Sequence, residues 1–176
     1  MNDDVLDLGW FRRFMFLQSS LGDSTAERVP LKSASASSAG SQTLEEALCL
    51  LREELRPGGS RFRIFVTGKS RALNPNVQEQ IYLIGREALL NALHHSEATS
   101  IEAEIEYLPN RLRVVVRDNG CGIGPEVVRS DRNGHWGLVG MHERAGSIGG
   151  RLRIWSGSGC GTEVEICVPG DVEASA

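Results

Sequence analysis

Several features that mark common protein classes are scarce or missing in this chain. No apolar run approaches the roughly 18 to 20 residues of a membrane span, because Arg12 and Arg13 interrupt the apolar cluster between residues 10 and 17. The net charge is −4 and no basic stripe appears, which argues against nucleic acid as the main partner. We therefore expect a chain without a membrane span that does not bind nucleic acid.

The cysteines of the chain show no paired metal-ligand spacing, and no secretory leader precedes them. Free thiols in a reducing cytosol are the simplest account of them, so we expect a cytoplasmic protein. The four cysteines are Cys49, Cys121, Cys160 and Cys167.

The composition of the chain favours one globular domain with a modest core, since 40% of its 176 residues are hydrophobic and 24% are charged. Residues 32–42 are rich in Ser, Ala and Gly, which is typical of a flexible linker. We expect residues 1–42 to be poorly structured, residues 43–170 to form the domain and residues 171–176 to be a tail. The apolar cluster at residues 10–17 fits either an amphipathic docking helix or the remnant of a longer segment.

Apolar residues at helical spacing predict three helices, and alternating apolar residues predict five strands. A capping box of Thr43 and Glu46 begins the first helix, and Asn74 and Pro75 begin the second. Helices that cover one face of a sheet built largely from hairpins form a two-layer α/β sandwich with a mixed, mostly antiparallel sheet. The expected helices are residues 44–55, 75–95 and 138–149, and the expected strands are residues 62–66, 101–107, 112–118, 152–154 and 162–168.

Three glutamates, Glu102, Glu104 and Glu106, alternate with apolar residues along one of these strands. They resemble an acidic site, but successive glutamates are two residues apart and do not bind a common ligand. We expect a solvated sheet face.

A polar stripe lies near the C-terminal end of the second helix. Glu87, Asn91 and His95 are four residues apart, so they stack along one side of the helix. A carboxylate one turn from a carboxamide suits Mg2+, which prefers oxygen ligands and keeps some of its waters. The same spacing is also typical of a solvated polar face, and the helix alone leaves both interpretations open.

A second candidate site follows the strand that ends at Asp118. The next residues are Asn-Gly-Cys-Gly-Ile-Gly, and Gly120 and Gly122 permit positive φ and close approach of a flat ligand. A carboxylate there can accept a hydrogen bond from an exocyclic amine such as that of adenine. Alone, Asp-x-Gly-x-Gly is more often a turn, but Glu87 and Asn91 upstream favour a nucleotide site.

Two further glycine clusters lie downstream. Residues 134–141, Gly-His-Trp-Gly-Leu-Val-Gly-Met, predict a flexible loop that opens a helix near Leu138. The free amides and positive dipole end of that helix suit an anion, and Gly137 and Gly140 leave room for it. Trp136 fits either a core anchor or an exposed loop residue. Residues 157–162, Gly-Ser-Gly-Cys-Gly-Thr, lead into the last strand.

Together these four motifs resemble the ATP-binding domain of sensor histidine kinases, within the superfamily shared with gyrase, chaperone and mismatch-repair ATPases. Two sequence motifs look like those of the branch of large sensors with a periplasmic propeller. They are Arg-Glu-Ala-Leu-x-Asn-Ala-x-x-His-Ser and, further on, Gly-His-Trp-Gly-Leu-x-Gly-Met. The resemblance covers roughly Thr43 to Pro169. It implies the Bergerat-type fold, in which ATP lies between the helices and a lid.

The resemblance also implies a role for each matching residue. Asn91 would bind Mg2+, and Glu87 would order a metal-bound water or act as a catalytic base. Asp118 would take the adenine N6 amine, and Thr162 would reach the same side of the base. Residues 125–140 match the family's ATP lid. The remaining residues expected to bind ATP are His94, His95, Gly120, Gly122, Ile123, Gly137, Leu138, Gly140, Met141 and Gly161.

One departure from the family lies at His94, where relatives usually carry Arg or Lys to contact phosphate. A neutral imidazole attracts phosphate less, so we predict weak or pH-sensitive nucleotide affinity. Measuring ATP affinity between about pH 6 and pH 8 tests this, and a flat profile would remove the idea.

A second departure concerns the phosphoacceptor. The family transfers a phosphoryl group to a histidine on a preceding dimerising helix, but residues 1–93 contain no histidine. Phosphoryl transfer depends on positioning the acceptor, so we expect this chain to be the catalytic part alone. Its partner would be a dimerisation and phosphoacceptor domain and, through it, a response regulator.

Three functions fit the sequence at this point. The first is a two-component histidine kinase domain that uses Mg-ATP to phosphorylate a histidine on another domain or chain. The second is a serine kinase of the anti-sigma-factor type, although the intact Gly-His-Trp-Gly-Leu lid counts against it. The third is a regulatory module that binds ATP without phosphoryl transfer.

Overall fold

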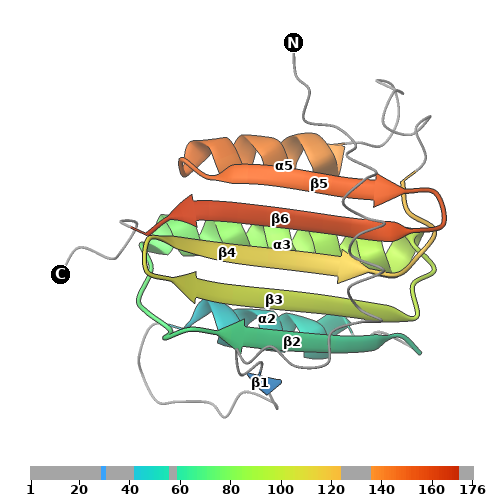
Figure 1. Cartoon of the computed structure of the whole chain (residues 1–176), viewed down its shortest axis with the longest axis horizontal. Helices are drawn as coiled ribbons and strands as arrows, with labels where there is room; N and C mark the ends of the chain where they lie inside the picture. Colours follow the sequence, from blue (N-terminus) through green and yellow to red (C-terminus); the bar gives the residue numbers. More distant parts are fainter. Residues whose placement is uncertain (1–28, 31–41, 56–58, 124–135, 171–176) are drawn as a thin grey trace.

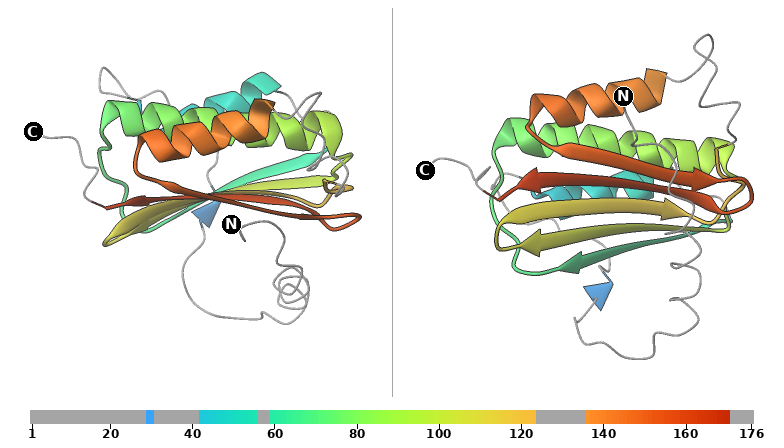
Figure 2. Two further views of the ribbon diagram at one scale, coloured as in Figure 1. Left: turned by 90° about the horizontal axis from the view of Figure 1, so that it is seen from above. Right: turned by 45° about the horizontal axis from the view of Figure 1, so that its top comes forward.

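The computed structural model describes residues 29–30, 42–55, 59–123 and 136–170. They form a mixed six-stranded sheet in the order β1-β2-β3-β4-β6-β5, and three helices lie together on one of its faces (Figures 1 and 2). β2 runs parallel to β3, and every other neighbouring pair is antiparallel. The predicted two-layer α/β sandwich is therefore confirmed.

The elements follow the predicted order closely. The helices are α2 (Leu44–Leu55), α3 (Pro75–His95) and α5 (Trp136–Ser147). The strands are β1 (Val29–Pro30), β2 (Arg61–Thr67), β3 (Ser100–Leu108), β4 (Arg111–Asp118), β5 (Arg151–Gly157) and β6 (Gly161–Pro169).

The starts of the first two helices confirm the predicted caps. The Thr43 amide donates to Glu46 Oε2 at 3.0 Å, and the Glu46 amide donates to Thr43 Oγ1 at 3.3 Å. At α3, Asn74 Oδ1 accepts from the Asn76 amide at 3.0 Å, and Pro75 takes the first helical position. Each cap satisfies amides that have no partner inside the helix.

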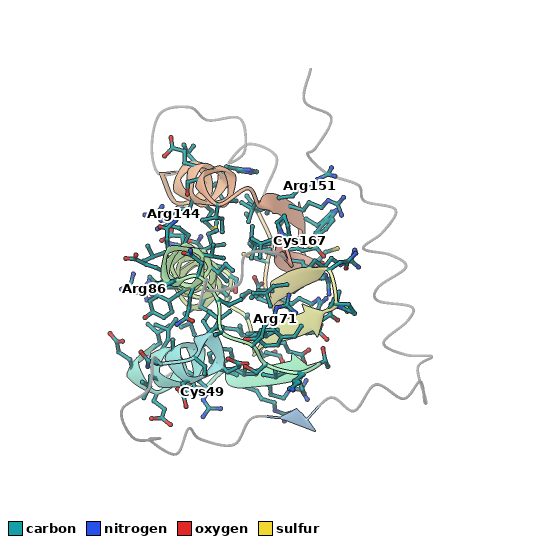
Figure 3. All side chains as sticks on the ribbon, turned by 90° about the vertical axis from the view of Figure 1, so that its left-hand side faces the viewer. Cys49, Arg71, Arg86, Arg144, Arg151 and Cys167 are labelled. Carbon is teal, nitrogen blue, oxygen red and sulfur yellow. The ribbon has the colours of Figure 1, made fainter. Side chains whose placement is uncertain are left out.

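The core lies between the helices and the sheet face that they cover. Leu48 of α2, Leu89 of α3 and Met141 of α5 are buried against alternate residues of the central strands, such as Ile105 and Val114. Figure 3 shows side chains filling this layer between ribbons. The period-two pattern of the strands and the helical period of α2 and α3 both point to this one interface.

The opposite face of the sheet differs from the prediction. Glu104 is only 2% exposed, so the expected solvated face is wrong for the middle of this strand. Arg117 of β4 lies between two strands and pairs with Glu104 of β3 at 2.8 Å and with Glu163 of β6. Arg113 likewise pairs with Glu106 at 3.0 Å and with Glu165 at 2.5 Å. Long arginine side chains therefore cover the carboxylates.

Two boundaries also differ from the prediction. α5 begins at Trp136, two residues before the expected start. β1 was not expected within residues 1–42; it pairs Val29 with Val66 and Pro30 with Phe65 at the edge of the sheet. Of the lid assigned to residues 125–140, residues 125–135 lie outside the described residues and residues 136–140 belong to α5; the tail at residues 171–176 and the side chain of Trp136 also lie outside the described part. None of the helices in the described part of the chain is long and apolar enough to cross a membrane.

Candidate functional site

Asp118 stands at the end of the sheet where α3 also ends and β6 begins. It is the last residue of β4, and its cross-strand partners are Ile101 of β3 and Thr162 of β6. Because side chains alternate along a strand, Asp118 lies on the same face as Val116 and Val114, which is the face toward the helices. The strand register thus brings Asp118 and Thr162 together, as the sequence predicted.

The carboxylate of Asp118 is held by neutral donors. Its Oδ1 accepts from the Gly120 amide at 2.8 Å. Burial raises the pKa of Asp118, while the Gly120 amide, the Ser96 hydroxyl and the Thr162 amide act to lower it. The balance leaves a carboxylate that is costly to keep charged and ready to accept a hydrogen bond from a ligand amine.

The turn after Asp118 is docked on the end of α3. The Cys121 amide donates to the Ser96 carbonyl at 2.7 Å, and a Cβ on Gly120 would overlap the backbone oxygen of Ser96. Asn119 Oδ1 accepts from the amides of Thr99 and Ser100 at 3.0 and 2.9 Å. Only glycine fits at position 120, because any side chain would overlap Ser96. The hydrogen bonds of Cys121 and Asn119 hold the turn against the end of the helix.

A second glycine turn, between β5 and β6, is bonded to the first. The Gly159 amide donates to the Cys121 carbonyl at 2.7 Å. Gly122 (φ +71°) lies against the Gly157 carbonyl, and Gly161 (φ +78°) lies against the Asp118 carbonyl. A Cβ at either position would overlap backbone atoms, so both glycines are required for close approach as well as for positive φ.

Ser156 of β5 joins the two turns. Its hydroxyl accepts from the Ile123 amide at 2.7 Å, donates to the Gly161 carbonyl at 3.0 Å and lies 2.9 Å from Thr162 Oγ1. Ser156 is 8% exposed. Sequence reasoning missed this residue, because Ser156 lies beyond the strand expected at residues 152–154, and only the observed register of β5 and β6 sets it opposite Thr162.

The polar stripe of α3 faces the start of α5. The carboxylate of Glu87 lies so close to Gly137 that a Cβ there would overlap Glu87 Oε1. Asn91 follows one turn later and is half-buried, like Glu87. The carboxylate is thus placed at the N-terminal end of a 12-residue helix, where the dipole favours negative charge.

The donor set on α3 fits Mg2+. Asn91 and Glu87 offer an amide oxygen and a carboxylate oxygen one helical turn apart, and Mg2+ is commonly bound by one or two such groups plus water and phosphate oxygens. In the part of the chain that the structure describes, no group of three or more His, Cys, Asp or Glu could hold a metal. These residues therefore fit a metal that arrives with its ligand better than one held by the protein alone.

The other predicted site residues fall into two groups. Asp118, Gly120, Gly122, Ile123, Gly161 and Thr162 form one hydrogen-bonded cluster. Of the rest, His94 and His95 are exposed at the end of α3, Leu138 packs half-buried on the core, and Gly140 faces the Arg144 side chain one turn on. Met141 is 1% exposed, so it supports the site from within the core.

Comparison with known proteins adds to this geometry. Residues 76–172 match the family model described as "Histidine kinase-, DNA gyrase B-, and HSP90-like ATPase". The chain is 39% identical over 83 residues to the nitrate/nitrite sensor protein NarX of Escherichia coli (strain K12), a match that covers 47% of this chain and 13% of NarX. It is 32% identical over 101 residues to the histidine-protein kinase/phosphatase DegS of Bacillus subtilis (strain 168), covering 57% of this chain and 26% of DegS.

Two solved structures share the fold. The blue-light activated histidine kinase of Erythrobacter litoralis EL346 superposes with a TM-score of 0.55 at 23% identity, covering 72% of this chain and 47% of that one. The mycobacterial sensor histidine kinase MprB gives a TM-score of 0.51 at 21% identity, covering 72% and 91%. The match thus spans 13% of NarX and 26% of DegS, but nearly all of the MprB structure.

Proposed function

Because the chain belongs to the family of histidine kinase-, DNA gyrase B- and HSP90-like ATPases and carries its ATP-binding catalytic domain, we propose that it phosphorylates a histidine on another domain or chain. Residues 43–170 would be the catalytic unit of a two-component sensor kinase, with Mg-ATP as the phosphoryl donor. The phosphoacceptor would be supplied by a dimerisation domain, which would pass the phosphoryl group to a response regulator.

The observation that carries this proposal is the setting of Asp118. A half-buried carboxylate with a raised pKa, compensated by neutral donors and not by a cation, contributes little to stability but can accept a hydrogen bond from a ligand donor. The adenine amine is such a donor. The glycine turns on either side, with Gly120, Gly122 and Gly161 packed against backbone atoms, fix the backbone around this carboxylate.

Residues of α3 and α5 would bind the phosphate groups of ATP. Asn91 and Glu87 would hold Mg2+, which would neutralise phosphate charge when bound. Glu87 lies against Gly137 at the start of α5, so its carboxylate is positioned where it could accept the proton of an attacking nucleophile or order a water. The α5 amides at Gly137 and Leu138 would offer hydrogen bonds to the phosphates.

The finer assignments are also part of the proposal. A cytoplasmic location follows from the need for ATP. His94 is exposed at the end of α3, and the reduced phosphate attraction predicted for it stands as a prediction. The propeller-type branch gains no support from NarX or DegS, so we propose a kinase of the NarX and DegS kind instead.

The proposed activity can be tested by incubating the chain with radiolabelled ATP, Mg2+ and a purified dimerisation domain from a NarX-like kinase. An acid-labile, base-stable label on that domain is expected, because phosphohistidine hydrolyses in acid. An acid-stable label would indicate a serine kinase of the anti-sigma-factor type. ATP binding with no label on any partner would indicate a regulatory module, and the absence of ATP binding would overturn all three.

A further inference from the structure

Three residues form a row across the end of the sheet, on the face toward the helices. Asp118 of β4 is directly opposite Thr162 of β6, and Thr162 is directly opposite Ser156 of β5. Directly opposed residues have Cβ atoms about 4.5–5.5 Å apart, so the Thr162 hydroxyl lies between a hydroxyl and a carboxylate. The direction of the Thr162 hydroxyl proton therefore decides whether Thr162 offers a ligand a hydrogen-bond donor or an acceptor.

The hydrogen bonds of Ser156 fix that direction. A serine hydroxyl has one proton to donate and two lone pairs to accept with. The proton points to the Gly161 carbonyl at 3.0 Å, and one lone pair accepts from the Ile123 amide at 2.7 Å. In the contact with Thr162 Oγ1 at 2.9 Å either hydroxyl could donate, and all three contacts are hydrogen bonds only when this one uses the second lone pair of Ser156, so that Thr162 donates.

This assignment uses the full capacity of a buried hydroxyl, and it has a consequence for Thr162. With its proton committed to Ser156, Thr162 can only accept from a ligand. Asp118, when ionised, can also only accept. The row therefore presents two acceptors side by side, which match the two N–H groups of an exocyclic amine and repel a carbonyl oxygen.

We propose that Ser156 is the positioning residue that makes the site select 6-amino over 6-oxo purines, by holding the Thr162 hydroxyl as an acceptor. This inference rests on the proposed function, because it concerns the base of the same nucleotide. Without the Ser156 hydroxyl, the Thr162 hydroxyl can donate to Asp118, where it competes with the ligand amine. It can also donate to the oxygen of a 6-oxo base and so stabilise binding of that base.

The test compares ADP with inosine diphosphate, which carries oxygen in place of the amine at C6. Binding of each to the full chain is measured by calorimetry with Mg2+ for the wild type and for Ser156→Ala. We expect the wild type to prefer ADP strongly and the variant to lose about 5- to 10-fold of that preference. Ser156→Thr keeps the hydroxyl and should keep the preference. Ser147→Ala removes an exposed serine hydroxyl on α5, bonded to the Arg144 carbonyl, and should also keep it.

Coupling between the two hydroxyls gives a second measurement. Thr162→Val should lower the preference for ADP by itself, and Ser156→Ala added to it should change the preference no further. If Ser156→Ala does not fold, the comparison of Thr162→Val with Thr162→Ser carries the test, because only the valine variant should lose selectivity.

The outcomes separate the two proposals. A wild-type chain that binds neither nucleotide overturns the proposed function and this inference with it. A wild-type chain that binds ADP, with a Ser156→Ala variant that weakens ADP and inosine diphosphate equally or changes neither, overturns the inference alone. So would equal selectivity of the valine and serine variants at position 162.

Discussion

Asp118, which is half-buried, and Glu163, which is buried, are carboxylates near the same end of the sheet, but they have opposite surroundings. Glu163 follows the cross-strand partner of Asp118 in β6 and lies on the face away from the helices. Burial raises the pKa of both. The carboxylate of Glu163 is compensated by the guanidinium of Arg117, whereas that of Asp118 is compensated by amides and a hydroxyl.

The difference shows how a carboxylate becomes available for binding. A fixed cation such as Arg117 satisfies the charge permanently and commits the carboxylate to the fold. Neutral donors satisfy it only in part, so a ligand amine can add a further bond. Figure 3 places Arg151 and Cys167 on the sheet side of the molecule, away from the helices, which is the face that carries the Arg–Glu pairs.

The largest effect is expected from removing the cation. Arg117→Leu leaves Glu104 and Glu163, whose side chains are 3% and 2% exposed, without their shared guanidinium. Breaking a buried pair in this way costs about 3–5 kcal/mol of unfolding free energy, measurable by denaturant titration. Arg111→Leu, at the exposed start of the same strand, is the matched control and should change stability by less than about 0.5 kcal/mol. Equal stabilities of the two variants would contradict a structural role for the pairs.

Removing the charge of Asp118 should have the opposite effect, lowering ADP affinity and not the stability of the domain. Asp118→Asn replaces a half-buried ionised group by a neutral one of the same shape, so stability should be kept or rise slightly. ADP affinity should fall about 10- to 100-fold, because a charge-assisted hydrogen bond to the base is lost. Glu163→Gln is the matched variant and should lower stability while leaving ADP affinity intact once folded. The comparison fails if both variants affect the same quantity.

Gly137→Ala extends the comparison to a third carboxylate, that of Glu87. The new Cβ would overlap Glu87 Oε1, so the carboxylate must move, and phosphoryl transfer should fall about 10-fold. Gly146 of the same helix has nothing within 4 Å of an added Cβ. Gly146→Ala should therefore keep full activity and gain up to about 1 kcal/mol from helix propensity. Activity assays and thermal unfolding of both variants decide the matter, and unchanged activity of Gly137→Ala would remove Glu87 from the reaction.

The smallest effect is a pH dependence of nucleotide binding. Because burial raises the folded pKa of Asp118 above its ordinary value of 3.8, the carboxylate gains a proton sooner in the folded chain than in the unfolded chain. ADP affinity should fall as pH drops from neutral into the range between that raised pKa and 3.8, because a protonated carboxyl group is a poorer acceptor for the amine. In the same window the stability of the free domain should fall slightly as pH rises. Calorimetry across this range should show no such decline for Asp118→Asn; a parallel decline in the variant would assign the effect to another group.

The fold was largely predictable because its apolar periods are regular. Leu48, Leu89 and Ile105 belong to patterns that repeat at helical or strand spacing, and the caps at Thr43 and Asn74 set where helices begin. The outer face was harder, because Glu104 and Arg117 read as solvated charges one strand at a time. Only the strand register shows that they neutralise each other.

The candidate site was predictable where a residue lies in a recognisable motif, as for Asp118 and Asn91, whose ligand contacts stay proposals. Supporting residues such as Ser96, Asn119 and Ser156 were missed because their role depends on contacts between turns that are distant in sequence. Gly137 was expected to make room for phosphate, and the structure adds that Glu87 already lies against it.

The two ends of the segment at residues 124–135 are each attached to the frame independently. Ile123 is tied to Ser156 before it, and α5 packs on α3 after it. The turn at Ile123 and the start of α5 therefore keep their positions through contacts of their own, whatever length of chain joins them.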